Sequence, residues 1–222
     1  MYLSKIELDP IKYKTRRAIL SPEVFHAAIE KCFCEKPNGD ERNLWRMDSI
    51  GGKLHLLILS PVKPDFTRFI EQFCISGTSG ETRDYDVLLN KLQPGQRWRF
   101  RLRGNATSSS SQGEGKRGKV LAHNSIKYQR EWLCKKAIKC GFALDNDLYN
   151  VVGKDKLGFQ RTGQIAPVSL GVAVFEGELT ITDVDLFRNA LTHGIGRAKA
   201  YGCGLLTIAS PRVAPMADQS IN

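Results

Sequence analysis

One segment alternates strictly between cationic and apolar residues: Arg97-Trp98-Arg99-Phe100-Arg101-Leu102-Arg103. Because successive side chains of a strand point to opposite faces, it predicts a strand with one apolar face and one face carrying four arginines. Pro94-Gly95 lies just before the segment and interrupts the preceding structure. The segment therefore predicts the first strand of a second structural unit, which begins near residue 94.

The residues before this segment predict the order strand, helix, strand, strand, helix, strand. The first helix begins at Ser21, where Pro22 suits the first helical position and Glu23 favours the helix dipole. The second helix spans Asp65 to Phe73. The strands are expected at Tyr2–Leu8, Leu44–Asp48, Lys53–Ser60 and Tyr85–Leu89. This order is typical of a ferredoxin-like domain.

The residues after the segment repeat the order. A low-complexity, serine-rich loop is expected at 106–115 and a basic helix at about 125–140. Further strands are expected near Tyr149–Val152, Val172–Ile181 and Leu205–Ala209, with a helix that opens at Thr182. The sequence thus predicts an α+β protein of two tandem ferredoxin-like domains, 1–93 and 94–222.

Positive charge is concentrated in one part of the chain. The 222 residues contain 33 Lys and Arg against 23 Asp and Glu, and residues 97–140 hold twelve of these cations and two of the acids. Such a field attracts polyanions, above all nucleic-acid backbones. Aromatic residues that can stack bases lie between the cations: Trp98, Phe100, Tyr128 and Trp132. A solvated basic face that only aids solubility is the alternative, and a membrane-surface helix is disfavoured because the core needs the apolar positions.

Composition argues against several other classes. The longest aliphatic run is Leu56–Leu59, so no membrane span is expected, and the first 20 residues lack the apolar stretch of a secretory signal. None of the six cysteines forms a C-x-x-C pair or has a histidine at zinc-site spacing. We therefore expect reduced thiols in a cytoplasmic protein, with no metal and no cofactor.

One histidine lies off the apolar face of the first predicted helix. At 100° per residue the apolar residues from Val24 to Cys32 form one stripe, and His26 points away from it, toward Glu23 and Glu30. Such an imidazole can act as a general acid or base, although a surface histidine without a role is the commoner case. His55, His123 and His193 are better explained as strand, phosphate- or water-contacting and helix-end residues.

The segment Gly194–Leu206 contains four glycines between the last helix and the last strand. Glycine permits positive φ and close approach of another backbone, and Arg197 and Lys199 lie among the exposed amides. The segment lacks the G-K-[ST] ending of a P-loop. A tight structural turn would also use these glycines.

This segment resembles the glycine-rich loop of the RAMP proteins of CRISPR systems. The whole chain is similar to the CasE family, the CRISPR-RNA-processing endoribonucleases of type I-E systems. The similarity covers residues 1–209 and follows five segments in order: Met1–Lys5, Leu44-Trp45-Arg46, Arg99–Asn105, Phe175-Glu176-Gly177 and Gly194–Leu206.

The resemblance implies a metal-independent endoribonuclease that cuts the hairpin repeats of precursor CRISPR RNA, leaving 2′,3′-cyclic phosphate and 5′-hydroxyl ends. It implies that the enzyme stays on the product hairpin, the mature guide RNA, and joins other subunits of a type I-E surveillance complex. His26 falls at the position of the family's catalytic histidine, as general acid or base. Glu23 stands where relatives often carry a tyrosine, which puts that tyrosine's role in question here.

Basic residues are the candidate RNA contacts. The family's basic loop near the cleaved phosphate corresponds to 154–161, with Lys154, Lys156 and Arg161 as candidates. The charge pattern adds Arg99, Arg101, Arg103, Lys116, Arg117, Lys119, Arg130, Arg197 and Lys199. A non-catalytic RAMP subunit that scaffolds a guide-RNA complex is the alternative function, and a ribosomal or other housekeeping RNA-binding protein is a weaker one.

Overall fold

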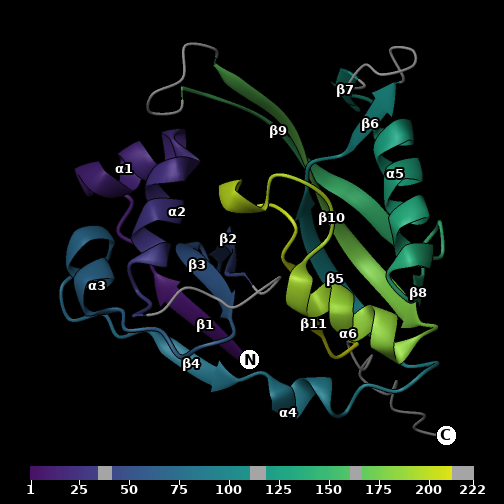
Figure 1. Cartoon of the computed structure of the whole chain (residues 1–222), viewed down its shortest axis with the longest axis horizontal. Coiled ribbons are helices and arrows are strands. Elements are labelled where there is room, and N and C mark those ends of the chain that lie inside the picture. Colours follow the sequence, from purple (N-terminus) through teal and green to yellow (C-terminus); the bar gives the residue numbers. More distant parts are fainter. Residues whose placement is uncertain (35–41, 111–118, 161–166, 212–222) are drawn as a thin grey trace, which may run out of the picture.

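Two β-sheets with packed helices make up the computed structural model, which describes residues 1–34, 42–110, 119–160 and 167–211 (Figure 1). The first half contains β1 (Tyr2–Glu7), α1 (Tyr13–Leu20), α2 (Pro22–Glu30), β2 (Leu44–Ile50), β3 (Lys53–Ser60), α3 (Thr67–Phe73), β4 (Glu81–Asp84) and α4 (Asp86–Leu89). The second contains β5 (Arg97–Gly104), β6 (Thr107–Ser110), β7 (Lys119–Ala122), α5 (Ile126–Lys139), β8 (Phe142–Ala143), β9 (Tyr149–Phe159), β10 (Val168–Ile181), α6 (Val184–His193), the 3₁₀ turn η1 (Lys199–Tyr201) and β11 (Leu206–Ala209).

Both sheets have the same topology. The N-terminal sheet has the strand order β2-β3-β1-β4, and the C-terminal sheet has β11-β5-β10 with β9 and β8 both paired to β10. In each, the first strand of the unit lies between the last two strands of its sheet, and all pairs are antiparallel. This repetition confirms the predicted α+β class with two tandem ferredoxin-like units. The predicted division at 93/94 falls in the connection between α4 and β5 and stays a prediction.

Three expectations about elements are wrong. Residues 86–89 form the helix α4, and the fourth strand lies just before it, at β4. Part of the serine-rich loop is the strand β6, which pairs with β7. Neither β4 nor β6 has the alternating apolar pattern by which a strand is predicted. Both still pair, because the hydrogen bonds between strands come from the backbone. A separate helix, α1, precedes α2, and the Ser21 side chain makes no capping hydrogen bond.

The N-terminal core fixes the orientation of α2. Phe25 and Ile29 of α2 are fully buried. The Phe25 ring lies 5.9 Å from the Trp45 ring of β2 and 5.2 Å from the Phe73 ring of α3, measured between centroids. With these two residues turned into the core, the neighbouring His26 points off the apolar stripe and is half-exposed.

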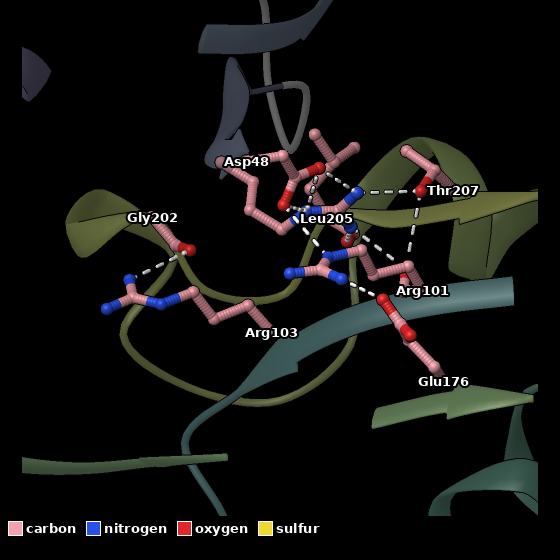
Figure 2. Close-up of polar contacts among 8 residues, drawn as sticks. Asp48, Arg101, Arg103, Glu176, Gly202, Leu205 and Thr207 are labelled. Carbon is pink, nitrogen blue, oxygen red and sulfur yellow. Dashed lines mark hydrogen bonds and ion pairs between the residues drawn. The ribbon is translucent and has the colours of Figure 1, made fainter. Parts of the chain in front are cut away.

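A buried arginine joins the two units, and its partners Asp48, Leu205 and Thr207 are labelled in Figure 2. Arg46 of β2 is 1% exposed and donates from Nε and Nη2 to the carboxylate of Asp48 at 2.6–3.0 Å. Its Nη1 donates to the carbonyl oxygens of Arg101 and Leu205, each at 2.8 Å, and its Nη2 donates to Thr207 Oγ1 at 2.8 Å. Strands β2 and β11, at the facing edges of the two sheets, are thereby held together.

Candidate active site and nucleic-acid interface

His26 is a half-exposed side chain on α2, as the helical pattern predicts. Its side chain is 39% exposed, and its Nδ1 lies 3.7 Å from Glu30 Oε1, one helical turn further along. Nδ1 itself is buried and has no hydrogen-bond partner among the described residues. Because Nδ1 is buried and faces Glu30, Nε2 is the ring nitrogen left for a substrate.

A cavity of about 540 Å³ lies beside His26, between α1, α2 and α3. Besides His26, its lining includes four cations, Lys14, Arg17, Lys31 and Arg68, and two acids, Glu23 and Asp65. None of these four cations was predicted from the sequence. Three basic residues in the stretch Lys14–Arg17, immediately before the histidine helix, were the signal that could have revealed part of the set.

The glycine-rich loop passes between the two units. Gly202 has φ +75°, and a Cβ added there would lie 2.7 Å from the Trp45 ring, so only glycine fits. Ala198 has φ 62° and is the one non-glycine residue with positive φ in the described part of the chain. Left-handed backbone at a non-glycine residue is strained, and such strain gathers at functional sites.

Lys199 of this loop is brought next to the histidine helix. It lies in η1, which packs against α2 and β2, so that a cation of the second unit is carried on an element that contacts the histidine helix. Burial lowers the pKa of Lys199, and the positive charge of Arg42 lowers it further. A partly desolvated ammonium interacts strongly with a nearby anion, because little water screens it.

A second basic depression, the α5 groove, lies between α5, the start of β6 and the glycine-rich loop. Its volume is about 510 Å³. Its cations are Lys135, Lys136, Lys139 and Arg197, and Glu131 is its one acid. At one end the rings of His123 and Tyr128 stack at 5.7 Å between centroids. The lysines at 135, 136 and 139 share one face of α5, a spacing that the sequence analysis did not single out.

Arg99 and Arg101 line a different cavity of about 700 Å³ on the C-terminal sheet. That cavity also contains Asp147, Glu176 and Glu178, so its carboxylates outnumber its arginines. Arg101 is ion-paired with both Asp48 and Glu176 (Figure 2), and Arg99 Nε donates to the Ser210 carbonyl at 2.9 Å. Arg99 and Arg101 therefore lie among carboxylates and do not form part of a basic surface.

Two further predicted arginines, Arg103 and Arg130, donate hydrogen bonds to backbone carbonyls of the protein. Arg103 is 11% exposed, and its Nη1 donates to the carbonyls of Tyr201 and Gly202 in the glycine-rich loop. Arg130 donates to the Tyr149 and Asn146 carbonyls and lies 4.4 Å from the centroid of the Tyr149 ring. For both residues a contact with RNA stays a prediction, whereas the structural role is visible.

The remaining predicted residues are distributed as follows. Arg197 is exposed in the α5 groove, and its backbone forms an isolated antiparallel β-bridge with Asn105. Lys154 and Lys156 are exposed on β9, opposite Ala173 and Gly171 of β10. Lys119 begins β7. Lys116, Arg117 and Arg161 lie outside the described residues.

The described residues contain neither a metal-binding cluster nor a membrane-spanning helix. Across the described ranges, no three His, Cys, Asp or Glu side chains gather as a metal site would require. No helix within the same ranges has both the length and the apolar character of a membrane span.

Comparisons with known proteins agree with these features. The CRISPR-associated endoribonuclease Cse3 of Thermus thermophilus is 27% identical over 223 residues, which cover 94% of this chain and all of that protein. The structure of Thermus thermophilus Cse3 bound to an RNA representing a pre-cleavage complex superposes with a TM-score of 0.78 at 26% identity, covering 94% of this chain and 98% of that one.

A chain of a CRISPR RNA-guided surveillance complex, in its pre-nicking form, superposes with a TM-score of 0.69 at 25% identity, covering 95% of this chain and 100% of that one. The profile of the family described as CRISPR associated protein matches residues 1–210. The resemblance to CasE, another name for Cse3, is thereby confirmed, and the chain belongs to the CRISPR associated protein family.

Proposed function

We propose that this protein is an endoribonuclease that cleaves the hairpin repeats of precursor CRISPR RNA, with His26 as its catalytic residue. The observation that carries the proposal is a half-exposed imidazole beside a cavity lined by four cations, on the helix α2 against which η1 of the glycine-rich loop packs. The relatives named as Cse3 endoribonucleases, one of them bound to RNA, support the same activity.

In the proposed reaction the 2′-hydroxyl of the substrate attacks the adjacent phosphorus. The 2′-O–P bond forms and the P–O5′ bond breaks, leaving a 2′,3′-cyclic phosphate and a 5′-hydroxyl. One proton leaves the 2′-oxygen and one is added to the departing 5′-oxygen, and Nε2 of His26 accepts the first or supplies the second. The four cations that line the cavity beside His26, and Lys199 on the element that packs against α2, are the candidates to stabilise the negative charge of the transition state.

The α5 groove is the proposed site for the hairpin stem. An A-form stem is recognised through phosphates and 2′-hydroxyls, which lysine and arginine side chains bind. The four cations of the groove meet this need, and the His123–Tyr128 stack offers a platform for an unpaired base. We also propose a cytoplasmic location, consistent with the free thiols of all six cysteines, and retention of the product within a surveillance complex, in line with the similar chain found in one.

The test is His26→Ala, with His193→Ala as the matched control because His193 lines neither basic cavity. We expect His26→Ala to slow single-turnover cleavage of a repeat hairpin by about 10²- to 10⁴-fold while leaving hairpin affinity nearly unchanged. A protein that binds the hairpin but never cuts it, even with His26 intact, would instead support the scaffolding function. Equal loss of binding and cleavage in His26→Ala would indicate a structural role.

A further inference from the structure

The carboxylate of Glu30 links His26 to the start of β2. Its Oε1 lies 3.7 Å from His26 Nδ1, and Asn43 Nδ2 donates to Oε1 at 3.3 Å and to Oε2 at 3.2 Å. Asn43 is buried, and the Phe25–Trp45 contact holds α2 against the same strand. The three side chains therefore form a row in which the amide fixes the carboxylate and the carboxylate faces the imidazole.

Helix stability does not explain Glu30. It is the last residue of α2, where the helix dipole disfavours a negative charge. A carboxylate facing one nitrogen of a histidine decides which nitrogen carries the proton. The distance of 3.7 Å exceeds a hydrogen bond, but catalytic hydrogen bonds in substrate-free enzymes are often long and tighten when substrate binds.

We infer that Glu30 is a positioning residue that keeps the proton of neutral His26 on Nδ1, so that Nε2 is free to react, and that Asn43 orients Glu30. The inference rests on the proposed catalytic role of His26. It identifies the reacting nitrogen and adds two residues that act through His26 to the machinery of the reaction.

The row makes a specific prediction for Glu30→Gln. Because Asn43 donates to residue 30, the new amide turns its oxygen toward Asn43 and its NH₂ toward His26. Nδ1 must then accept a hydrogen bond, and the proton moves to Nε2, the wrong nitrogen. In the double variant Glu30→Gln/Asn43→Asp the new carboxylate accepts from the amide, so the amide oxygen faces Nδ1 again and the correct tautomer returns.

The experiment measures single-turnover cleavage of a repeat hairpin, hairpin affinity and melting temperature, with exposed Glu71→Gln as the control. We expect Glu30→Gln to slow cleavage about 10- to 100-fold, with affinity and melting temperature unchanged, and Glu30→Gln/Asn43→Asp to recover most of the rate. Nitrogen-15 NMR of the histidines should show the proton of His26 moving from Nδ1 to Nε2 in Glu30→Gln and returning in the double variant.

A double-mutant comparison separates the two levels of the proposal. If Glu30 acts through His26, His26→Ala/Glu30→Gln cleaves no more slowly than His26→Ala. Normal cleavage by Glu30→Gln, an additive loss in the double variant, or a fall in melting temperature that accompanies the lost rate would overturn the role of Glu30. Normal cleavage by His26→Ala would overturn the proposed function itself.

Discussion

Replacing Arg46 with methionine should destabilise the whole protein, because it removes the buried cation that joins the two sheets. Methionine keeps most of the aliphatic stem, so the loss is confined to the guanidinium. Its removal takes away the bidentate ion pair to Asp48 and the hydrogen bonds to two carbonyls and to Thr207 Oγ1. Asp48, 6% exposed, then keeps Arg101 as its one cationic partner among the described residues.

Breaking a buried ion pair by removing one partner costs about 3–5 kcal/mol, and we expect Arg46→Met to lose free energy of unfolding in this range. Equilibrium urea unfolding at 25 °C, followed by tryptophan fluorescence, measures the loss. Arg97→Met is the matched control, since Arg97 makes an exposed ion pair with Glu178 at 2.8 Å and should lose about 1 kcal/mol or less. Equal small losses in both variants would show that the interdomain network contributes nothing to stability.

Three further predictions concern RNA binding, the glycine-rich loop and alkaline pH. Replacing the three groove lysines by alanine should reduce the slope of log Kd against log salt by about 3, with no change when the exposed Lys53, Lys63 and Lys91 are replaced. Gly202→Ala should lower the free energy of unfolding by about 2–4 kcal/mol, from strained φ and the clash with Trp45, whereas Gly77→Ala, at φ +83° in open space, should lose only the smaller strain term. Burial raises the pKa of Cys32 to about 12 and those of Cys74 and Cys203 to about 11. Each native thiol therefore holds its proton more tightly than the same thiol in the unfolded chain. The free energy of unfolding that this provides below pH 9 should be lost as pH rises from 9 to 11. In Cys203→Ala the fall of the free energy of unfolding with pH should be less steep by about 1.4 kcal/mol per pH unit.

The fold was largely predictable because most of its elements carry an apolar period. β5 alternates strictly, and α2 combines Phe25 and Ile29 at helical spacing with Pro22 at its start. β4 was misplaced because an exposed edge strand of sequence Glu-Thr-Arg-Asp has no buried face to reveal it. The strand β6 was mistaken for loop because its sequence, Thr-Ser-Ser-Ser, contains no apolar residue.

The candidate site was only partly predictable, because sequence shows charge but not its partners. The position of His26 off the apolar stripe follows from helical geometry alone. The four arginines of β5 are equivalent in the sequence pattern. In the structure Arg101 is ion-paired with Asp48, and Arg103 donates to the glycine-rich loop. Contacts between residues more than fifty positions apart decide this, and no local pattern encodes them.

The most direct test of the proposed chemistry uses a repeat hairpin with a single 2′-deoxynucleotide at the scissile position, incubated with the enzyme in EDTA. The account predicts that the all-ribose hairpin is cut at its usual rate and yields a mass matching a 2′,3′-cyclic phosphate, while the deoxy hairpin binds and stays intact. Cutting of the deoxy hairpin would contradict attack by the substrate's own hydroxyl, and loss of all cleavage in EDTA would contradict a reaction that needs no metal ion.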